Sequence, residues 1–145
     1  MGIGLTNPSY KLQVNGAVAG TSAYVNTSDI RHKKNIEPLR AGLKEVNQLR
    51  PVTFEWKDGR SDDAAMKGQQ IGFIAQDVEK ILPSVIVTEN NDEKTKGMKY
   101  AEIIPVLVNA IQQQQAEIDS LKVMVEQSTL HKQPAHNDLQ NPGSR

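Results

Sequence analysis

Ser28 is followed by two lysines, Lys33 and Lys34, and these residue types could carry out nucleophilic chemistry. A serine hydroxyl attacks a carbonyl group only when a base takes its proton. A lysine amine can act as that base only when it is neutral, so burial or nearby positive charge must lower its ordinary pKa of about 10.4. Arg31 and His32 lie close enough in sequence to add such charge. The spacing fits a Ser–Lys dyad of Ser28 and Lys33, but taken alone it favours a capped turn with solvated charges.

The composition excludes several other classes of site. The 145 residues contain no cysteine, so disulfides and thiolate metal sites are excluded. Two of the three histidines, His131 and His136, lie in a polar C-terminal stretch, and we expect neither a metal site nor a cofactor. The formal net charge is +0, from 17 basic and 17 acidic residues. We therefore expect no nucleic acid and no membrane surface among the partners.

The N-terminal sequence predicts a fibrous segment rather than a leader peptide. It has neither a basic start nor an apolar run of the kind found in signal peptides, so we expect a soluble protein made in the cytoplasm. Residues 1–27 are rich in Gly, Asn, Ser and Thr, with short alternating stretches and a turn signal at Asn15–Gly16. This segment is too small to bury a core alone, so it predicts the end of a fibrous β structure that needs neighbouring chains.

Residues 28–128 predict an α+β domain, a small mixed unit of short strands and helices. Aromatic residues make up only 4% of the chain, which favours a small aliphatic core and makes a partner chain plausible. Asp77 is expected to cap a short helix at residues 78–82. The expected helices are 39–49 and 78–82, and the expected strands are 52–56, 71–75, 84–88 and 98–100.

One long helix is predicted from residue 101 to about 128, with Pro105 tolerated in its first turn. Apolar residues recur along it every seven residues, at Ile104, Ile111, Ile118 and Val125. The second position of this heptad pattern holds Leu107, Gln114, Leu121 and Ser128. The pattern predicts a parallel multi-chain coiled coil for the second half, while the first half also fits a helix packed on its own domain. Residues 129–145 lack periodicity and predict a flexible tail.

The stretch from Ser28 to Ile36, SDIRHKKNI, resembles the motif S-D-x-R-x-K-x-N-I of the endosialidase-type intramolecular chaperone family. This family consists of self-cleaving serine peptidases at the C-termini of phage tailspikes and tail fibres. Further matches follow in the family's order, at LRPVTFEW (49–56), GFIAQDV (72–78), Leu82–Pro83 and Tyr100. The resemblance therefore covers roughly residues 28–125.

The resemblance implies a function and a set of site residues. Ser28 would be the nucleophile, the family spacing of five would make Lys33 its base, and Thr27–Ser28 would be the scissile bond. The domain would form a homotrimer, fold the upstream tail-fibre β structure of the same chain, and then cleave itself off. Assembly would take place in the host cytoplasm. Residues 1–27 would stay in the virion tail and residues 28–145 would be released.

Three further motif residues have less certain roles. Asp29 would orient Lys33 or accept a hydrogen bond from a backbone N–H, and Arg31 would pair with a carboxylate of a neighbouring chain. A structural ion pair is an equal alternative for both. Asn35 would either hold the loop or donate to the oxyanion of the reaction.

Three other functions compete with self-cleavage. A non-catalytic trimerisation domain would carry the same motif without using it. A receptor-binding fibre tip is disfavoured by the low aromatic content. A DNA-binding coiled-coil factor is disfavoured by the neutral charge and the missing basic region.

Overall fold

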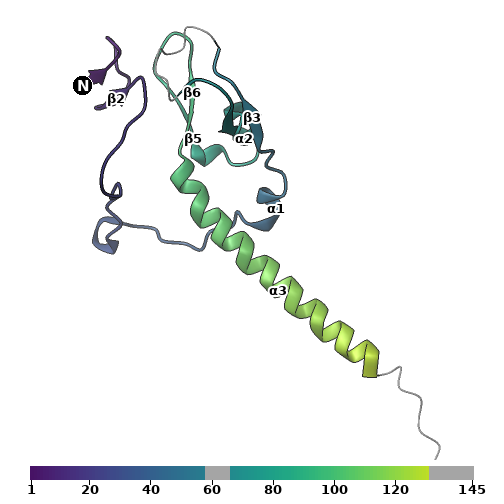
Figure 1. Ribbon diagram of the computed structural model, residues 1–145. Coiled ribbons are helices and arrows are strands. Elements are labelled where there is room, and N and C mark those ends of the chain that lie inside the picture. The colour runs from purple at the N-terminus through teal and green to yellow at the C-terminus, as the bar shows by residue number, and fades with distance from the viewer. Residues whose placement is uncertain (58–65, 131–145) are drawn as a thin grey trace, which may run out of the picture.

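The computed structural model describes residues 1–57 and 66–130. It consists of an extended N-terminal segment, a small head of short strands and helices, and one long helix (Figure 1). The elements in chain order are β1 (Gly2–Ile3), β2 (Gln13–Val14), η1 (Ile30–His32), α1 (Leu43–Val46), β3 (Val52–Phe54), β4 (Gln70–Gly72), α2 (Ala75–Glu79), η3 (Pro83–Val85), β5 (Ile86–Thr88), β6 (Lys96–Met98), η4 (Tyr100–Glu102) and α3 (Ile103–Leu130). The predicted mixture of short elements with one long C-terminal helix is confirmed.

The strands described form three separate two-stranded sheets. Strands β1 and β2 pair in parallel within the N-terminal segment, with Gly2 opposite Gln13. In the head, β3 pairs antiparallel with β4 and β5 pairs antiparallel with β6. Two-stranded sheets are marginal in water unless another element covers them. The head therefore depends on the helices packed against its strands.

A small aliphatic core joins α2 and η3 to the base of α3. Its buried side chains come from these three elements and from the residue that precedes η3, and they are Val78, Leu82, Val85, Ile103 and Val106. Val46 of α1 packs against this cluster from the side. Burial of each such side chain contributes about 1.5–3 kcal/mol. A core of this size holds the head together but leaves most of α3 without intrachain contacts.

Several elements differ from their predicted bounds. The helix expected at 39–49 is shortened to α1, because residues 39–42 run in extended form onto α3. Helix α2 begins three residues earlier than expected, so Asp77 lies in its first turn and is not its cap, a position that Ile74 occupies. The strand expected at 98–100 ends at Met98. Tyr100 instead begins η4, and its hydroxyl oxygen accepts a hydrogen bond from the Phe73 N–H at 3.3 Å.

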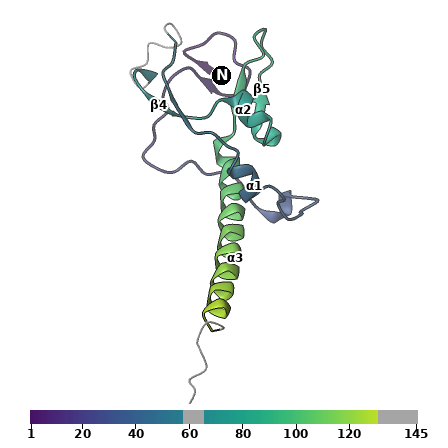
Figure 2. The same cartoon turned by 90° about the vertical axis from the view of Figure 1, so that its right-hand side faces the viewer.

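Helix α3 extends well beyond the head (Figure 2). It has two distinct faces. Ile103, Val106 and Ala110 face the core and are buried, whereas the apolar heptad residues are exposed, at Ile104, Leu107, Ile111, Ile118, Leu121 and Val125. We call this exposed set the seam. The helix reaches Leu130, two residues into the predicted tail, and the remaining tail residues, 131–145, lie outside the described part of the chain.

Among residues 1–57 and 66–130, none of the helices is both long and apolar enough to cross a membrane.

Candidate active site

A single 3-10 turn, η1, brings the two ends of the SDIRHK stretch together. Fully extended, the five-residue step from position 28 to position 33 would span about 17 Å. A 3-10 helix rises only about 2.0 Å per residue, and the Lys33 N–H closes this one on the Ile30 carbonyl at 3.0 Å. Asp29 starts the turn as its N-cap, with its carboxylate accepting from the Arg31 N–H at 2.9 Å. The turn therefore folds Lys33 back toward Ser28.

The lysine and serine side chains meet directly. Lys33 Nζ donates to Ser28 Oγ at 2.7 Å. A general base must lie within hydrogen-bond distance of the proton that it removes. The Nζ–Oγ distance meets this requirement, because a neutral amine at the same position could accept the hydroxyl proton. The two residues predicted to be catalytic are thus in hydrogen-bond contact, and Thr27 precedes Ser28 directly in the chain.

Asp29 and Arg31 form a fork-shaped ion pair inside the turn. Arg31 Nη2 lies 2.6 Å from one carboxylate oxygen of Asp29, and Arg31 Nε lies within 3.1 Å of both. The side-chain bond to Arg31, followed by the bond to its backbone N–H, holds the pKa of the Asp29 carboxyl below its ordinary value. The carboxylate therefore faces Arg31 rather than Lys33. The arginine pairs within its own turn, and this pairing offsets the positive charge that it would otherwise place near Lys33.

Asn35 shapes the chain that leaves the turn. Its φ is 54°, in the left-handed region that asparagine adopts more readily than most residues. The residue type is therefore explained by the bend that it occupies, and a role at the oxyanion stays a prediction. His32, the last residue of η1, and Lys34, two residues after it, are both exposed.

The turn is exposed to solvent and flanked by exposed apolar side chains. Ser28 and Lys33 are exposed in the single chain. Ile30, inside the turn, is 71% exposed and Ile36, just after it, is 65% exposed. Figure 1 shows the segment around residue 30 standing away from the head, on the side of α3 opposite to α1. The environment that would neutralise Lys33 by desolvation is therefore not supplied by the head of the same chain.

The chain between the turn and α1, residues 33–42, is anchored on α3. We call this segment the strap. Asn109 Nδ2 donates to the Leu39 carbonyl at 3.1 Å and to the Ala41 carbonyl at 2.9 Å. At the end of the strap, Gln113 Oε1 accepts from the Leu43 N–H at 2.8 Å. Neither anchor is predicted from the sequence. One signal was present, because asparagine is a poor former of helix interiors.

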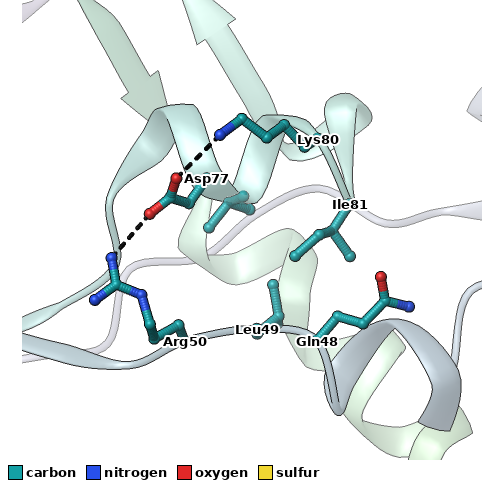
Figure 3. Close-up of a pocket in the computed structure, with 7 residues that line it drawn as sticks. Gln48, Leu49, Arg50, Asp77, Lys80 and Ile81 are labelled. Atoms are coloured by element: carbon teal, nitrogen blue, oxygen red, sulfur yellow. Dashed lines mark hydrogen bonds and ion pairs between the residues drawn. The ribbon is translucent and has the colours of Figure 1, made fainter.

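A hollow on the head is separate from the dyad. It is lined by the end of the α1 region and by α2, and Asp77 bridges Arg50 at 3.0 Å and Lys80 at 3.3 Å across its rim (Figure 3). The side-chain bond to Arg50, and then that to Lys80, lowers the pKa of the Asp77 carboxyl. This network joins α2 to the segment before β3. It explains why Asp77 points outward and does not cap α2.

Known proteins share the sequence of the turn and of much of the head. A peptidase family model described as chaperone of endosialidase matches residues 28–87. This part of the chain is thus a chaperone-of-endosialidase domain and belongs to that family, as the sequence predicts. Membership of this peptidase family implies an autoproteolytic serine peptidase.

Two kinds of curated relative match the chain more broadly. Myelin gene regulatory factor-like A of Dictyostelium discoideum is 24% identical over 136 residues, which cover 85% of this chain and 15% of that protein. Long tail fiber protein Gp37 of Enterobacteria phage M1 is 32% identical over 97 residues, covering 66% of this chain and 38% of that protein. The corresponding protein of Enterobacteria phage Ox2 gives the same values. The chain thus spans well under half the length of these relatives.

Proposed function

We propose that this chain is the C-terminal chaperone of a phage tail fibre or tailspike, and that it cleaves itself at Thr27–Ser28 after trimerisation. The observation that carries the proposal is the 2.7 Å contact between Lys33 Nζ and Ser28 Oγ, which lie five positions apart on either side of one turn. The family match begins at Ser28, on the C-terminal side of the proposed cut. The similarity to tail fiber proteins supports a place in the virion tail for residues 1–27.

The proposed reaction uses only groups of this chain and one water molecule. Neutral Lys33 takes the proton from Ser28 Oγ, and the oxygen attacks the carbonyl carbon of Thr27. The Thr27–Ser28 amide bond breaks as Lys33 returns the proton to the nitrogen of Ser28, leaving an ester between Thr27 and Ser28 Oγ. Water then hydrolyses this ester to a free Thr27 carboxylate and the regenerated Ser28 hydroxyl. Each chain reacts once.

Trimerisation is supported by the exposed seam of α3. Six apolar side chains at heptad positions face solvent in the single chain, whereas the core-facing residues lie on another side of the helix. Isoleucine or valine at the first heptad position with leucine at the second is by itself typical of two-stranded coils, so the count of three chains rests on the resemblance to the tail-fibre chaperone family. A homotrimer would bury the seam without disturbing the head.

The exposure of the dyad supports coupling between assembly and cleavage. Ser28 and Lys33 are both exposed in the isolated chain, whereas a lysine acts as a base only where burial or nearby positive charge favours its neutral form. Neighbouring chains packed over Ile30 and Ile36 would exclude water from the pair and favour the neutral amine. Cleavage would then follow correct assembly. Loss of the folding template would leave the mature fibre kinetically trapped.

Intact-mass analysis of freshly made protein tests this function. The wild type is expected to yield two fragments whose masses sum to that of the full chain plus one water, with a new N-terminus reading Ser-Asp-Ile. Ser28→Ala and Lys33→Arg are expected to remain full length, because the first lacks the nucleophile and the second replaces a base with a permanently charged group. Lys34→Arg is the matched control and is expected to cleave.

The competing functions predict other results from the same samples. A wild type that forms trimers but keeps its full-length mass is a non-catalytic trimerisation domain, and the enzymatic proposal is then wrong. Persistence of cleavage in Lys33→Arg together with its loss in Lys34→Arg would move the base to the neighbouring lysine. Retention of residues 28–145 on finished fibres would favour the receptor-binding tip.

A further inference from the structure

The strap connects the dyad to the rest of the molecule without regular secondary structure of its own. Residues 33–42 contain neither helix nor strand, so their backbone polar groups must find partners elsewhere. Asn109 is one anchor, because its side chain donates to two carbonyls of the strap. Gln113 is the second anchor, because its side chain accepts from the N–H of Leu43, the first residue of α1. We call Asn109 and Gln113 the clamp. The two lie four residues apart, and therefore on the same face of α3.

Each member of the clamp fits its place closely. Asn109 is half-buried, and its amide nitrogen has two hydrogens, one for each of two carbonyls that lie two residues apart in the strap. Gln113 lies directly against the backbone of Gly42, where a Cβ would collide with the Gln113 side-chain amide. Glu45 completes the junction by accepting from the Gly42 N–H at 2.8 Å. The strap is thus fixed at one height along the long helix.

The clamp and the seam occupy different faces of α3. Asn109 and Gln113 fall on the side that also carries buried Val106 and Ala110. The seam residues Ile104 and Ile111 point away from that side and are exposed. Loss of the clamp therefore removes no seam contact. Its bonds link the helix proposed to assemble the trimer with the segment that carries Ser28 and Lys33.

We propose that Asn109, assisted by Gln113, is a positioning residue for the self-cleavage reaction. It holds the strap at a fixed height on α3, so that the Ser28–Lys33 pair of each chain meets the neighbouring chains that desolvate it. This inference rests on the proposed function, because it concerns the same reaction. Asn109 lies 81 positions after Ser28 in the sequence. Its proposed role is to present the dyad, not to fold the head.

Time-resolved cell-free synthesis tests the inference, with the cleaved fraction measured by gel and the oligomer measured by crosslinking in the same samples. Asn109→Ala is expected to slow cleavage within assembled trimers by about 10- to 100-fold, since small misplacements of reacting groups have effects of that size. Gln113→Ala removes one exposed bond and is expected to slow cleavage to a smaller extent. Gln115→Ala is the matched control, because Gln115 bonds to Asp119 within α3, and it is expected to cleave like the wild type.

Amide hydrogen exchange gives a second readout on trimers of the Ser28→Ala background. Asn109→Ala and Gln113→Ala are both expected to raise exchange at the Leu43 N–H, whereas exchange in the core around Val78 stays unchanged. Cleavage of Asn109→Ala trimers at the wild-type rate overturns the inference but leaves the proposed function intact. A parallel loss of trimers and cleavage in both clamp variants also overturns it, because the clamp is then only structural. A wild type that trimerises without cleaving removes the proposed function and this inference together.

Discussion

Two valines on α3 allow a strict test of the proposed coiled coil. Val125 belongs to the seam and is 61% exposed in the single chain, whereas Val123 lies on the opposite side of the helix and is 51% exposed. Substitution of either by alanine makes the same chemical change two residues apart. Alanine is also the better helix former, so neither variant should weaken the helix itself. Any difference between the two variants must come from what covers Val125.

The expected size of that difference follows from the exposed area. Valine to alanine removes two carbon groups, worth about 1.6 kcal/mol when fully buried at about 0.8 kcal/mol each. Because 61% of Val125 is still exposed in the single chain, assembly would contribute about 1.0 kcal/mol per chain through these groups. Three chains give about 3 kcal/mol, which corresponds to about a 100-fold weaker trimer association constant.

Sedimentation equilibrium over a range of concentrations measures this constant. The experiment uses the Ser28→Ala background, so that cleavage does not change the species present. Val125→Ala is expected to shift the monomer–trimer equilibrium by about 100-fold, and Val123→Ala is expected to leave it unchanged. Equal shifts in the two variants, or no shift in either, would refute the assignment of the seam. A limiting species of two chains rather than three would refute the trimer.

Two further predictions concern the head in the same background. The pKa of Asp77 is lowered mainly by Arg50, so its contribution to stability is present above the unfolded pKa of about 3.9 and is lost as pH falls through the lower folded value. In thermal unfolding followed by circular dichroism, Asp77→Asn should therefore melt below the parent at about pH 7, and this difference should shrink as pH falls below about 3.9; a difference that does not shrink on acidification would contradict the ion-pair account. Gly72→Ala should destabilise the head by about 1–3 kcal/mol in urea unfolding, because the added Cβ would lie 2.7 Å from Tyr100 Oη. Combining Gly72→Ala with Tyr100→Phe should recover part of this loss, because the next ring atom, Cζ, lies 3.9 Å from the added Cβ. If the stability losses of the two substitutions simply add in the double variant, the clash is not their cause.

Helices and strands of this fold were predictable from the sequence where apolar residues recur at a regular spacing. The heptad spacing from Ile104 to Val125 predicted α3, and the alternation at 52–56 predicted a strand that exists as β3. Short elements were less predictable because tertiary contacts decide their ends. Asp77 has the residue type of a helix cap, but the nearby charge of Arg50 gives it another partner. Residues 39–42 have helical spacing, but Asn109 holds their carbonyls instead.

The sequence proposes residues for the candidate site, but it does not predict their geometry. The SDIRHKKNI stretch makes Ser28 and Lys33 candidates through its resemblance to a family, and spacing alone did not separate a dyad from a solvated turn. The turn itself depends on Asp29, which both caps it and binds Arg31. The bonds from Asn109 to the strap cross about 70 positions of sequence, and no local pattern reports them.

The turn that carries the dyad is self-contained, since the hydrogen bonds that shape it join residues 28–33 to one another. Its geometry therefore does not depend on which sequence comes before Thr27. On the proposed chemistry, an unrelated fusion partner placed ahead of that threonine would be freed with a single extra residue at its carboxyl terminus. Residues 28–145 would then serve as a removable tag that needs no added protease and that releases only cargo already gathered into threes.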